Sequence, residues 1–318
     1  MKYKILLYFL LPILFFSCNN NLETKSPNVI IVITDDQGYG DIGYNGNPHL
    51  ITPNLDKFAG ESMRFNNFNV SPVCAPTRSS LLTGRYSLRT GVTDTYNGGA
   101  IMSSNEITLA EIFNENNYKT GIFGKWHLGD NYPSRPSDQG FQESLIHLSG
   151  GIGQVGDFTN YYKGSTSYYD PILWLNNKQE KYNGYCSDIF TDEAIKFIED
   201  NKDNQFFCYL SFNAPHTPLQ VPDKYYQMYK DIDPTNINGE SLEMTEKNIL
   251  DAKKIYGMVT NIDENFGKLI NKLDELNLKE NTIVIFMTDN GPQQPRYVSN
   301  LKGLKSQVYN GGIKVPFY

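Results

Sequence analysis

Continuous apolar runs rich in β-branched and aromatic residues recur along the chain and predict buried strands. Runs of this kind are typical of a parallel sheet covered on both faces, because neither side of such a strand meets water. They occupy residues 29–33, 120–124, 206–212 and 283–287.

Helical patterns separate these runs. Apolar residues at steps of three and four predict one long amphipathic helix over 249–273. Thr52 and Pro53 predict the start of another helix, with Thr52 as its cap. The shorter helices are predicted at 53–60, 76–82, 109–116 and 191–201. Strands that alternate with helices indicate an α/β fold with a mostly parallel sheet.

The stretch 150–185 is rich in Gly, Tyr and Asn and predicts a loop or lid. It contains a formal GxGxxG at 151–156. A dinucleotide site needs a strand before this motif and a helix after it, and we find neither pattern. We therefore interpret the segment as a flexible loop and reject a nucleotide site.

Composition narrows the class of protein. The chain has 318 residues and 36.2 kDa, 39% hydrophobic and 20% charged residues, as in ordinary globular proteins. This excludes a disordered chain and a multi-span membrane protein. A net charge of −7 and a pI near 5.2 argue against a nucleic-acid partner. Four cysteines are too few for a disulfide scaffold of this length.

The N-terminus has the pattern of an export signal. Residues 1–18 begin with Lys2 and Lys4, continue as a short apolar run and end at Cys18. The Ser-Cys pair resembles a bacterial lipoprotein signal, in which Cys18 is lipidated and anchors the protein to the membrane. The alternative is an ordinary secreted chain. Residues 19–27 are a polar tether, and because they lack an acidic run we expect the periplasmic side of the cell envelope.

Polar residues follow four of the predicted strands. Because the carboxyl ends of parallel strands share one rim, these residues should meet in one crevice. The pairs Asp35-Asp36 and Asp289-Asn290 offer oxygen ligands and contain no Cys or His. This favours Ca²⁺, or Mg²⁺, over zinc. The residues are Asp35, Asp36, Lys125, His127, His216, Asp289 and Asn290.

Cys74 opens the helix predicted just after it, with Arg78 one turn further on. A helix N-terminus favours an anionic nucleophile or a bound anion, and a buried structural thiol is the alternative. A metal and several cations in one crevice suit a small oxyanion: phosphate, sulfate or carboxylate.

These motifs together resemble the type I sulfatases of the alkaline-phosphatase superfamily. In that family a maturase oxidises the Cys of the motif Cys-x-Pro-x-Arg to formylglycine (3-oxoalanine). Here the motif runs from Cys74 to Arg78, with Thr77 where Ser is commoner. The other matching motifs, in the family's order, are 27–30 with Asp35-Asp36, Gly124-Lys125-Trp126-His127, Ala214-Pro215-His216, Thr288-Asp289-Asn290-Gly291 and 302–316.

The resemblance implies a three-layer α/β/α fold and a sulfuric ester hydrolase, arylsulfatase-like. Asp35, Asp36, Asp289 and Asn290, with the modified Cys74, would bind Ca²⁺. A hydroxyl of the hydrated formylglycine would attack the sulfate sulfur, and Arg78 would hold its oxygens.

The remaining roles concern the sulfate and the protons. The resemblance implies that Lys125, His216 and Lys305 bind the sulfate oxygens. His216 or Lys305 would protonate the departing alcohol. His127 would take a proton from the second hydroxyl, so that sulfate is expelled and the aldehyde restored.

This chain departs from the family in its last motif and its length. Asn310 stands where Glu is usual, and Leu304 and Ser306 where Gly is common. The chain stops at Tyr318, whereas family members continue. The resemblance therefore implies that residues 28–318 are a sulfatase catalytic domain without its C-terminal subdomain.

A sulfated carbohydrate is the expected substrate, since export suits polysaccharide breakdown. Aromatic residues in the loop would offer a stacking surface or simply pack it: Tyr161, Tyr162, Tyr168, Tyr169 and Trp174. The alternatives are a phosphate or phosphonate monoester hydrolase and an inactive glycan-binding lipoprotein. Cys186 and Cys208 would pair outside the cytosol or remain buried thiols.

Overall fold

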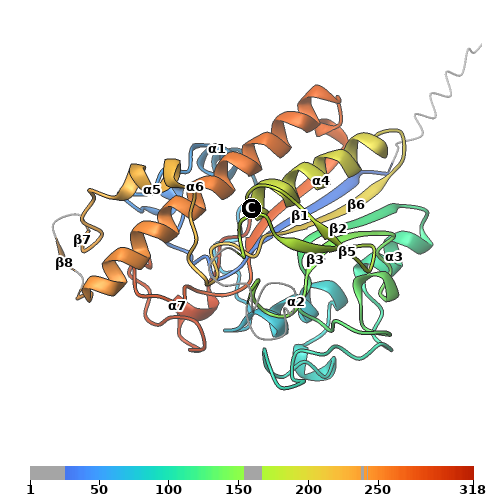
Figure 1. Ribbon diagram of the computed structural model, residues 1–318, viewed down its shortest axis with the longest axis horizontal. Coiled ribbons are helices and arrows are strands. Elements are labelled where there is room, and N and C mark those ends of the chain that lie inside the picture. Colours follow the sequence, from blue (N-terminus) through green and yellow to red (C-terminus); the bar gives the residue numbers. More distant parts are fainter. Residues whose placement is uncertain (1–25, 154–166, 238–239, 242) are drawn as a thin grey trace, which may run out of the picture.

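A seven-stranded mixed sheet runs through the centre of the molecule (Figure 1). The computed structural model describes residues 26–153, 167–237, 240–241 and 243–318. The strands of the sheet are β1 (Asn28–Thr34), β2 (Lys119–Lys125), β3 (Glu143–His147), β4 (Ile172–Leu175), β5 (Lys178–Lys181), β6 (Phe206–Ser211) and β9 (Thr282–Thr288). Their order is β5-β4-β3-β2-β6-β1-β9. Strands β3, β2, β6, β1 and β9, neighbours in this order, pair in parallel. At the edge beside β3, strands β4 and β5 pair antiparallel.

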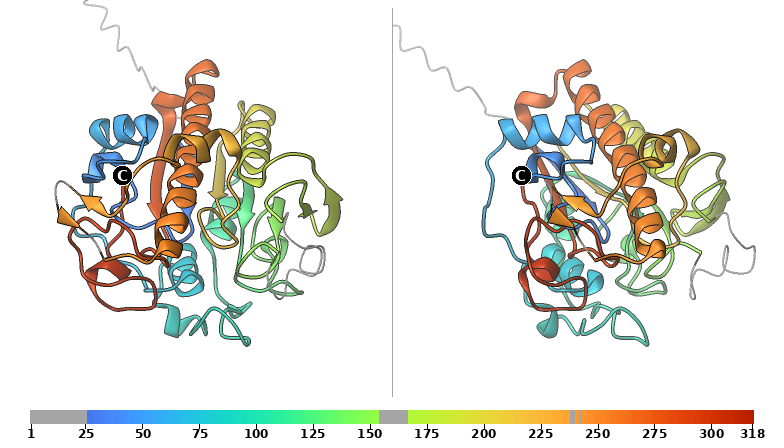
Figure 2. Two further views of the ribbon diagram at one scale, coloured as in Figure 1. Left: turned by 60° about the vertical axis from the view of Figure 1, so that its left-hand side comes forward. Right: turned by 90° about the vertical axis from the view of Figure 1, so that its left-hand side faces the viewer.

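Helices cover both faces of this sheet, as the sequence predicted for a three-layer α/β/α fold (Figures 1 and 2). On one face lie α1 (Pro53–Glu61), α4 (Cys186–Asp200) and α6 (Glu246–Glu275). On the other lie α2 (Cys74–Thr83) and α3 (Leu109–Glu115). The fold also contains α5 (Asp223–Tyr229), which packs on α6, the short α7 (Asn310–Ile313), and a hairpin of β7 (Asn236–Ile237) and β8 (Glu240–Ser241).

Strand β1 shows why its apolar run is continuous. Ile30 and Val32 belong to the core cluster beneath α4 and α6. Ile31 and Ile33, which alternate with them, belong to the cluster beneath α2 and α3. Both faces of the strand are therefore removed from water, and an alternating polar position would leave a buried polar group.

Gly124 marks the place where β2 and β6 approach each other closely. Its φ is +119°, and a Cβ atom built there would lie 1.8 Å from the carbonyl oxygen of Ser211. No side chain fits this space, so glycine is required where the strand delivers Lys125 to the carboxyl edge of the sheet.

Part of the loop prediction for 150–185 is wrong. The segment contains β4 and β5, which extend the sheet, and α4 begins at Cys186 rather than near Thr191. A strand, β3, does precede the GxGxxG motif, while residues 151–153 form a turn and the rest of the motif lies outside the described residues. Strand β5 has four exposed polar residues, so no apolar run marks it.

Helix α1 is capped differently from the prediction. Thr52 occupies the N-cap position, but its side chain makes no cap hydrogen bond. Instead the Asp263 carboxylate, from α6, accepts the backbone N–H groups of Asn54 at 3.2 Å and Leu55 at 2.7 Å. A carboxylate from the long helix thus satisfies orphan donors of α1 and joins the two helices.

Cys186 and Cys208 are buried free thiols, so the two do not pair. The proposed signal at 1–18, with Cys18, and the tether up to residue 25 lie outside the described residues. Among the residues that are described, none forms a helix long and apolar enough to cross a bilayer.

The packing of α6 generates a test of the fold. Leu269 is fully buried in the cluster between α6 and the sheet. We expect Leu269→Ala to lower the free energy of unfolding by about 2–5 kcal/mol, because it removes apolar contacts and leaves a cavity. Lys268→Ala, which breaks only the exposed pair with Asp192, should cost less than about 1 kcal/mol. Equal losses in urea titrations would contradict this packing.

Candidate active site

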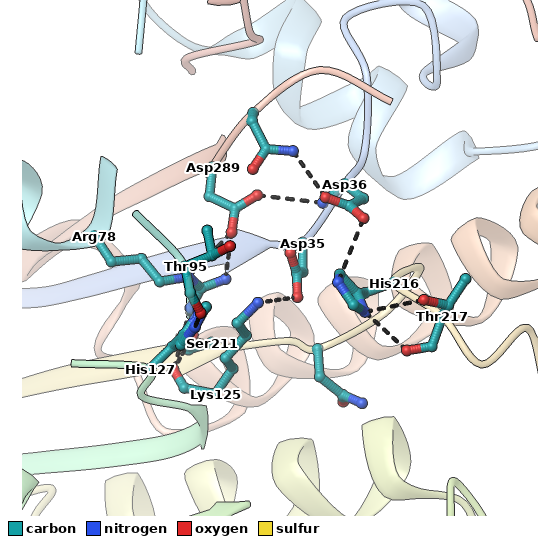
Figure 3. A network of polar contacts seen from close by, with 12 residues as sticks. Asp35, Asp36, Arg78, Thr95, Lys125, His127, Ser211, His216, Thr217 and Asp289 are labelled. Atoms are coloured by element: carbon teal, nitrogen blue, oxygen red, sulfur yellow. Dashed lines mark hydrogen bonds and ion pairs between the residues drawn. The ribbon is translucent and has the colours of Figure 1, made fainter. Parts of the chain in front are cut away.

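The carboxyl ends of β1, β2 and β9 and the N-terminus of α2 meet at one edge of the sheet, in a buried cluster of polar side chains called the crevice below (Figure 3). The side chains that the sequence assigned to a common rim do lie together there. Those linked by contacts are Asp35, Asp36, Arg78, Lys125, Asp289, Asn290, His216 and Lys305.

Three buried carboxylates are each paired with a different cation. Lys125 Nζ lies 2.5 Å from Asp35 Oδ2, and Lys305 Nζ lies 2.5 Å from Asp36 Oδ1. The guanidinium of Arg78 donates twice to Asp289 Oδ2, at 2.8 and 3.0 Å. The cations come from β2, from the loop before α7 and from α2, so three separate segments neutralise the acidic cluster.

These pairs leave oxygen atoms that suit a cation. Among the described residues, none donates a hydrogen bond to Asp35 Oδ1, Asp36 Oδ2 or Asn290 Oδ1, although all three atoms are buried. Asn290 instead uses its Nδ2 to donate to Asp36 Oδ1 at 2.8 Å, which directs its Oδ1 away from Asp36. Buried anionic oxygens without donors fit a hard divalent ion such as Ca²⁺ or Mg²⁺.

Burial and neighbouring charges shift the pKa values of Asp289 and Asp36 in opposite directions. Burial, and then the charge of Asp35, raise the pKa of Asp289 to about 6, against the opposing effect of Arg78. Burial also acts to raise the pKa of Asp36, but the ammonium of Lys305 and then His216 outweigh it, so that pKa lies below its ordinary range. A divalent cation would favour the charged form of both groups.

Cys74 is the first residue of α2 and is 2% exposed. Its Sγ, a carboxylate oxygen of Asp35 and one of Asp289 all lie within 4.8 Å of one another. Burial raises the pKa of the thiol, and Lys125 and Lys305 only partly oppose this. The unmodified side chain is therefore a neutral thiol, which argues against the thiolate nucleophile that the sequence left open.

His127 is held in one orientation at the end of β2. Its Nε2 lies 2.9 Å from the carbonyl oxygen of Thr95, which can only accept, so Nε2 carries the proton. Among the described residues none bonds to the buried Nδ1. Burial, followed by the charge of Lys125, puts the pKa of His127 well below its ordinary value. The ring is neutral and its Nδ1 can accept a proton.

His216 lies on the side of the crevice nearer to solvent. Its Nδ1 contacts the carbonyl oxygen of Thr217 at 2.8 Å, and its Nε2 is 3.7 Å from Asp36 Oδ2. Burial lowers its pKa to about 4, although Asp36 partly opposes the shift. The imidazole is thus neutral at pH 7, and its contact with Asp36 is not an ion pair.

The sequence analysis missed two residues around this crevice, Ser211 and His147. Ser211, at the end of β6, accepts from Arg78 Nη1 at 2.6 Å and donates to the Lys125 carbonyl at 2.7 Å. His147, at the end of β3, is paired in register with Lys125 and fully buried. The position of Ser211 near the end of a predicted strand was a usable signal for it. His147 gave no such signal, because β3 was not predicted.

Of the departures in the last motif, Leu304 and Ser306 flank Lys305 in the chain, whereas Asn310 lies away from the contacts that Lys305 makes. Asn310 is exposed at the first residue of α7. Gly311 and Gly312 pack directly against backbone atoms of the 303–307 segment, and Lys305 N–H donates to the Pro292 carbonyl at 2.9 Å. Glycines therefore bring this segment against the loop after β9, where Lys305 reaches Asp36.

Two of the aromatic residues that the sequence offered as a stacking surface, Tyr168 and Tyr169, have packing roles in the structure. Tyr161 and Tyr162 lie outside the described residues. Tyr168 is fully buried and donates to the carbonyl oxygens of His216 and Asn213. Tyr169 packs on Tyr185, edge to face. Tyr168 and Tyr169 thus pack the segment before α4 and support the loop that carries His216.

Fold and site together define an α/β protein with a buried acidic cluster that could hold a metal ion, beside a group of buried cations. The chain belongs to the sulfatase family, within the alkaline-phosphatase-like superfamily: the family profile "Sulfatase" matches residues 27–317.

Individual relatives agree with this assignment. Arylsulfatase J of Mus musculus is 30% identical over 92% of this chain and 47% of its own length. The ulvan-active sulfatase of Formosa agariphila is 30% identical over 93% of this chain and 56% of its own length. The solved structure of Ps i-CgsB in complex with k-i-k-neocarrahexaose is 33% identical, with a TM-score of 0.78 over 92% of this chain and 65% of that one. The chain thus spans about half the length of these two sequence relatives.

The unpaired oxygens predict that a divalent cation stabilises the fold. At a Ca²⁺ concentration 100 times the Kd, binding to the native state should add about 2.7 kcal/mol to the free energy of unfolding. Thermal unfolding with Ca²⁺ and with EDTA measures this. Asn290→Ala, which removes one of the free oxygens, should reduce the shift. If neither Ca²⁺ nor Mg²⁺ changes the melting temperature of the wild type, the cation site is wrong.

Proposed function

We propose that this chain carries the catalytic site of a sulfatase that removes sulfate from a sulfated saccharide, with Ca²⁺ and a formylglycine made from Cys74. The observation that carries this proposal is the position of Cys74. It begins a helix, and its Sγ lies within 4.8 Å of oxygens of Asp35 and Asp289. Membership of the sulfatase family supports the assignment.

Asp35, Asp36, Asp289 and Asn290 are the residues that would hold the cation, together with the modified Cys74. The ion would polarise the sulfate and lower the pKa of a neighbouring hydroxyl. The carboxylates are already held for this task. Asp35 and Asp36 are each bonded through one oxygen to a lysine, whereas Asp289 accepts from the Asp36 N–H at Oδ1 and from Arg78 at Oδ2. Mg²⁺ is the alternative ion.

Formylglycine would supply, as its hydrate, a hydroxyl nucleophile toward sulfur. Its formation is a two-electron oxidation at Cβ in which the C–S bond breaks, the sulfur leaves as sulfide and a C=O bond forms; the maturase supplies the electron acceptor. Arg78 lies four residues further along α2 and is fully buried. Its pairing with Asp289 and Ser211 directs the guanidinium toward the middle of the crevice (Figure 3), where it would orient the modified side chain.

Lys125, His216 and Lys305 would bind the sulfate oxygens and stabilise charge as the S–O bond breaks. Lys125 is fully buried, whereas the His216 and Lys305 side chains are 10% and 12% exposed. The alcohol must leave toward solvent, so its oxygen would lie on the side of His216 and Lys305. Burial acts to lower the pKa of Lys305, but Asp36 reverses the shift and raises it, so Lys305 holds a proton there; His216 would gain one beside a bound anion.

His127 would act as the base that releases sulfate. It would take the proton of the second hydroxyl at Nδ1, the nitrogen that no described residue occupies. The Thr95 carbonyl, which accepts from Nε2, would stabilise the imidazolium that results.

A saccharide substrate is supported by two similar proteins. The Formosa agariphila relative is described as active on ulvan, and the Ps i-CgsB structure holds a neocarrahexaose. Both cover more than nine-tenths of this chain at 30% identity or above. The runner-up activity, hydrolysis of a phosphate or phosphonate monoester, would use the same cations and is distinguished below.

The modification of Cys74 is the first test. In protein co-expressed with a formylglycine-generating maturase, the tryptic peptide 65–78 should carry an aldehyde in place of the thiol. Mass spectrometry of that peptide decides the matter. An intact thiol under these conditions would remove the nucleophile from the proposal and favour an inactive glycan-binding protein.

Kinetics of the matured protein give the second test. We expect a higher kcat/KM for an aryl sulfate than for the matched aryl phosphate, and steady sulfate release from a panel of sulfated oligosaccharides. Cys74→Ala should abolish turnover, whereas Cys208→Ala, an equally buried thiol in β6, should keep it. Faster phosphate release would favour the runner-up, and activity on aryl sulfates alone would count against a saccharide substrate.

We also propose that the protein is exported and anchored to the periplasmic side of the membrane by a lipid on Cys18. The proposal rests on the pattern of residues 1–25 alone. Cys18→Ala should move the protein from the membrane to the soluble fraction of the cell envelope. Equal membrane association of the variant and the wild type would show that Cys18 carries no anchor.

A further inference from the structure

Arg296 is a buried cation to which none of the roles above is assigned. It lies in the loop after β9, seven residues beyond Asp289, and its side chain is 0% exposed. Its Nε contacts both carboxylate oxygens of Asp41 at 2.9 Å, and its Nη2 contacts Asp41 Oδ2 at 2.6 Å. The same Nη2 donates to the backbone carbonyl of Asp36 at 2.7 Å.

Asp41 in turn closes the loop that follows β1. Its Oδ2 accepts the backbone N–H of Gly38 at 2.7 Å, and its own N–H donates to the Gly38 carbonyl at 3.0 Å. Gly38 packs against the ring of Pro292, so closely that a Cβ atom would lie 2.7 Å from it. The loop 35–41 and the loop 289–296 are therefore tied together at several points.

Asp36, between these ties, has an unusual backbone conformation. Its φ is +62°, in the left-handed region that residues other than glycine rarely adopt. Such a conformation persists when the surrounding contacts determine it. Here Arg296 holds the carbonyl, Asp289 Oδ1 accepts the N–H at 3.2 Å, and Asn290 and Lys305 bind the carboxylate.

We propose that Arg296, through Asp41, is a positioning residue for the metal ligand Asp36. From the loop after β9, the forked guanidinium holds the loop 35–41 at two points, the carboxylate of Asp41 and the backbone carbonyl of Asp36. These contacts keep Asp36 in the conformation that turns Oδ2, to which no described residue donates, into the crevice. Arg296 touches neither substrate nor ion in this role. The inference rests on the cation site of the proposed function.

A purely structural role makes a different prediction. If Arg296 and Asp41 only stabilise the fold, their substitution lowers the melting temperature and leaves the affinity for Ca²⁺ unchanged. If they position Asp36, the affinity falls even where the variant is folded. Substitution of groups that orient metal ligands typically costs 10- to 100-fold in metal affinity.

Calorimetric titration of the folded protein with Ca²⁺ alone distinguishes the structural role from the positioning role. Arg296→Lys keeps the buried charge but cannot bind Asp41 and the Asp36 carbonyl in the same forked geometry, and we expect a Kd for Ca²⁺ about 10- to 100-fold weaker than that of the wild type. Asp41→Asn removes the charge at the other end of the pair and should act in the same direction; it replaces Arg296→Lys in the comparison if that variant does not fold.

Asp263→Asn is the matched control. Asp263 is also a buried carboxylate that holds backbone N–H groups, but those belong to α1. It should lower the melting temperature and leave the Kd for Ca²⁺ unchanged. A folded Arg296→Lys protein with the affinity of the wild type would overturn the positioning role while the cation site stands. A wild type that binds neither Ca²⁺ nor Mg²⁺ would overturn the cation site itself, and the inference with it.

Discussion

The pairing of three buried carboxylates with three cations is the constraint on which this site depends. Asp35, Asp36 and Asp289 are removed from water, and an isolated buried carboxylate is too costly to keep ionised. Each is bonded to a cation from another segment: Lys125, Lys305 and Arg78. The acidic cluster is therefore balanced only when the sheet, α2 and the loop before α7 are all in place.

The same pairing is what the proposed binding of a metal and of an anion would build on. The cations occupy one oxygen of Asp35 and one of Asp36, which leaves the second oxygen of each without a donor among the described residues. A divalent ion at those oxygens would draw the carboxylates toward itself. The positive charge of Lys125, Lys305 and Arg78 would then be available to an oxyanion, which is the electrostatic requirement for binding a sulfate ester.

Elements with strong local patterns were predictable, and those held by distant contacts were not. The strand at 29–33 and the helix at 249–273 were found because each is buried along a regular period, and the structure extends them only to Asn28–Thr34 and Glu246–Glu275. Strand β5 has no apolar residue, and the first turn of α4 gave no periodic signal before Thr191. Thr52 occupies the N-cap position of α1 as predicted, but the carboxylate that accepts the first N–H groups of this helix belongs to Asp263, more than 200 residues away.

The sequence by itself determined the chemical groups, the order of the motifs and their places at strand ends, because these follow from residue identity and local periodicity. It placed Cys74 at a helix start and the acidic pairs after two strands, as the structure has them. Only the tertiary structure decided which cation meets which carboxylate, which nitrogen of His127 carries the proton, and that Arg296 holds the carbonyl of Asp36 from 260 residues away. Contacts between residues so far apart in sequence leave no periodic trace, and they arise only when the sheet brings its strand ends together.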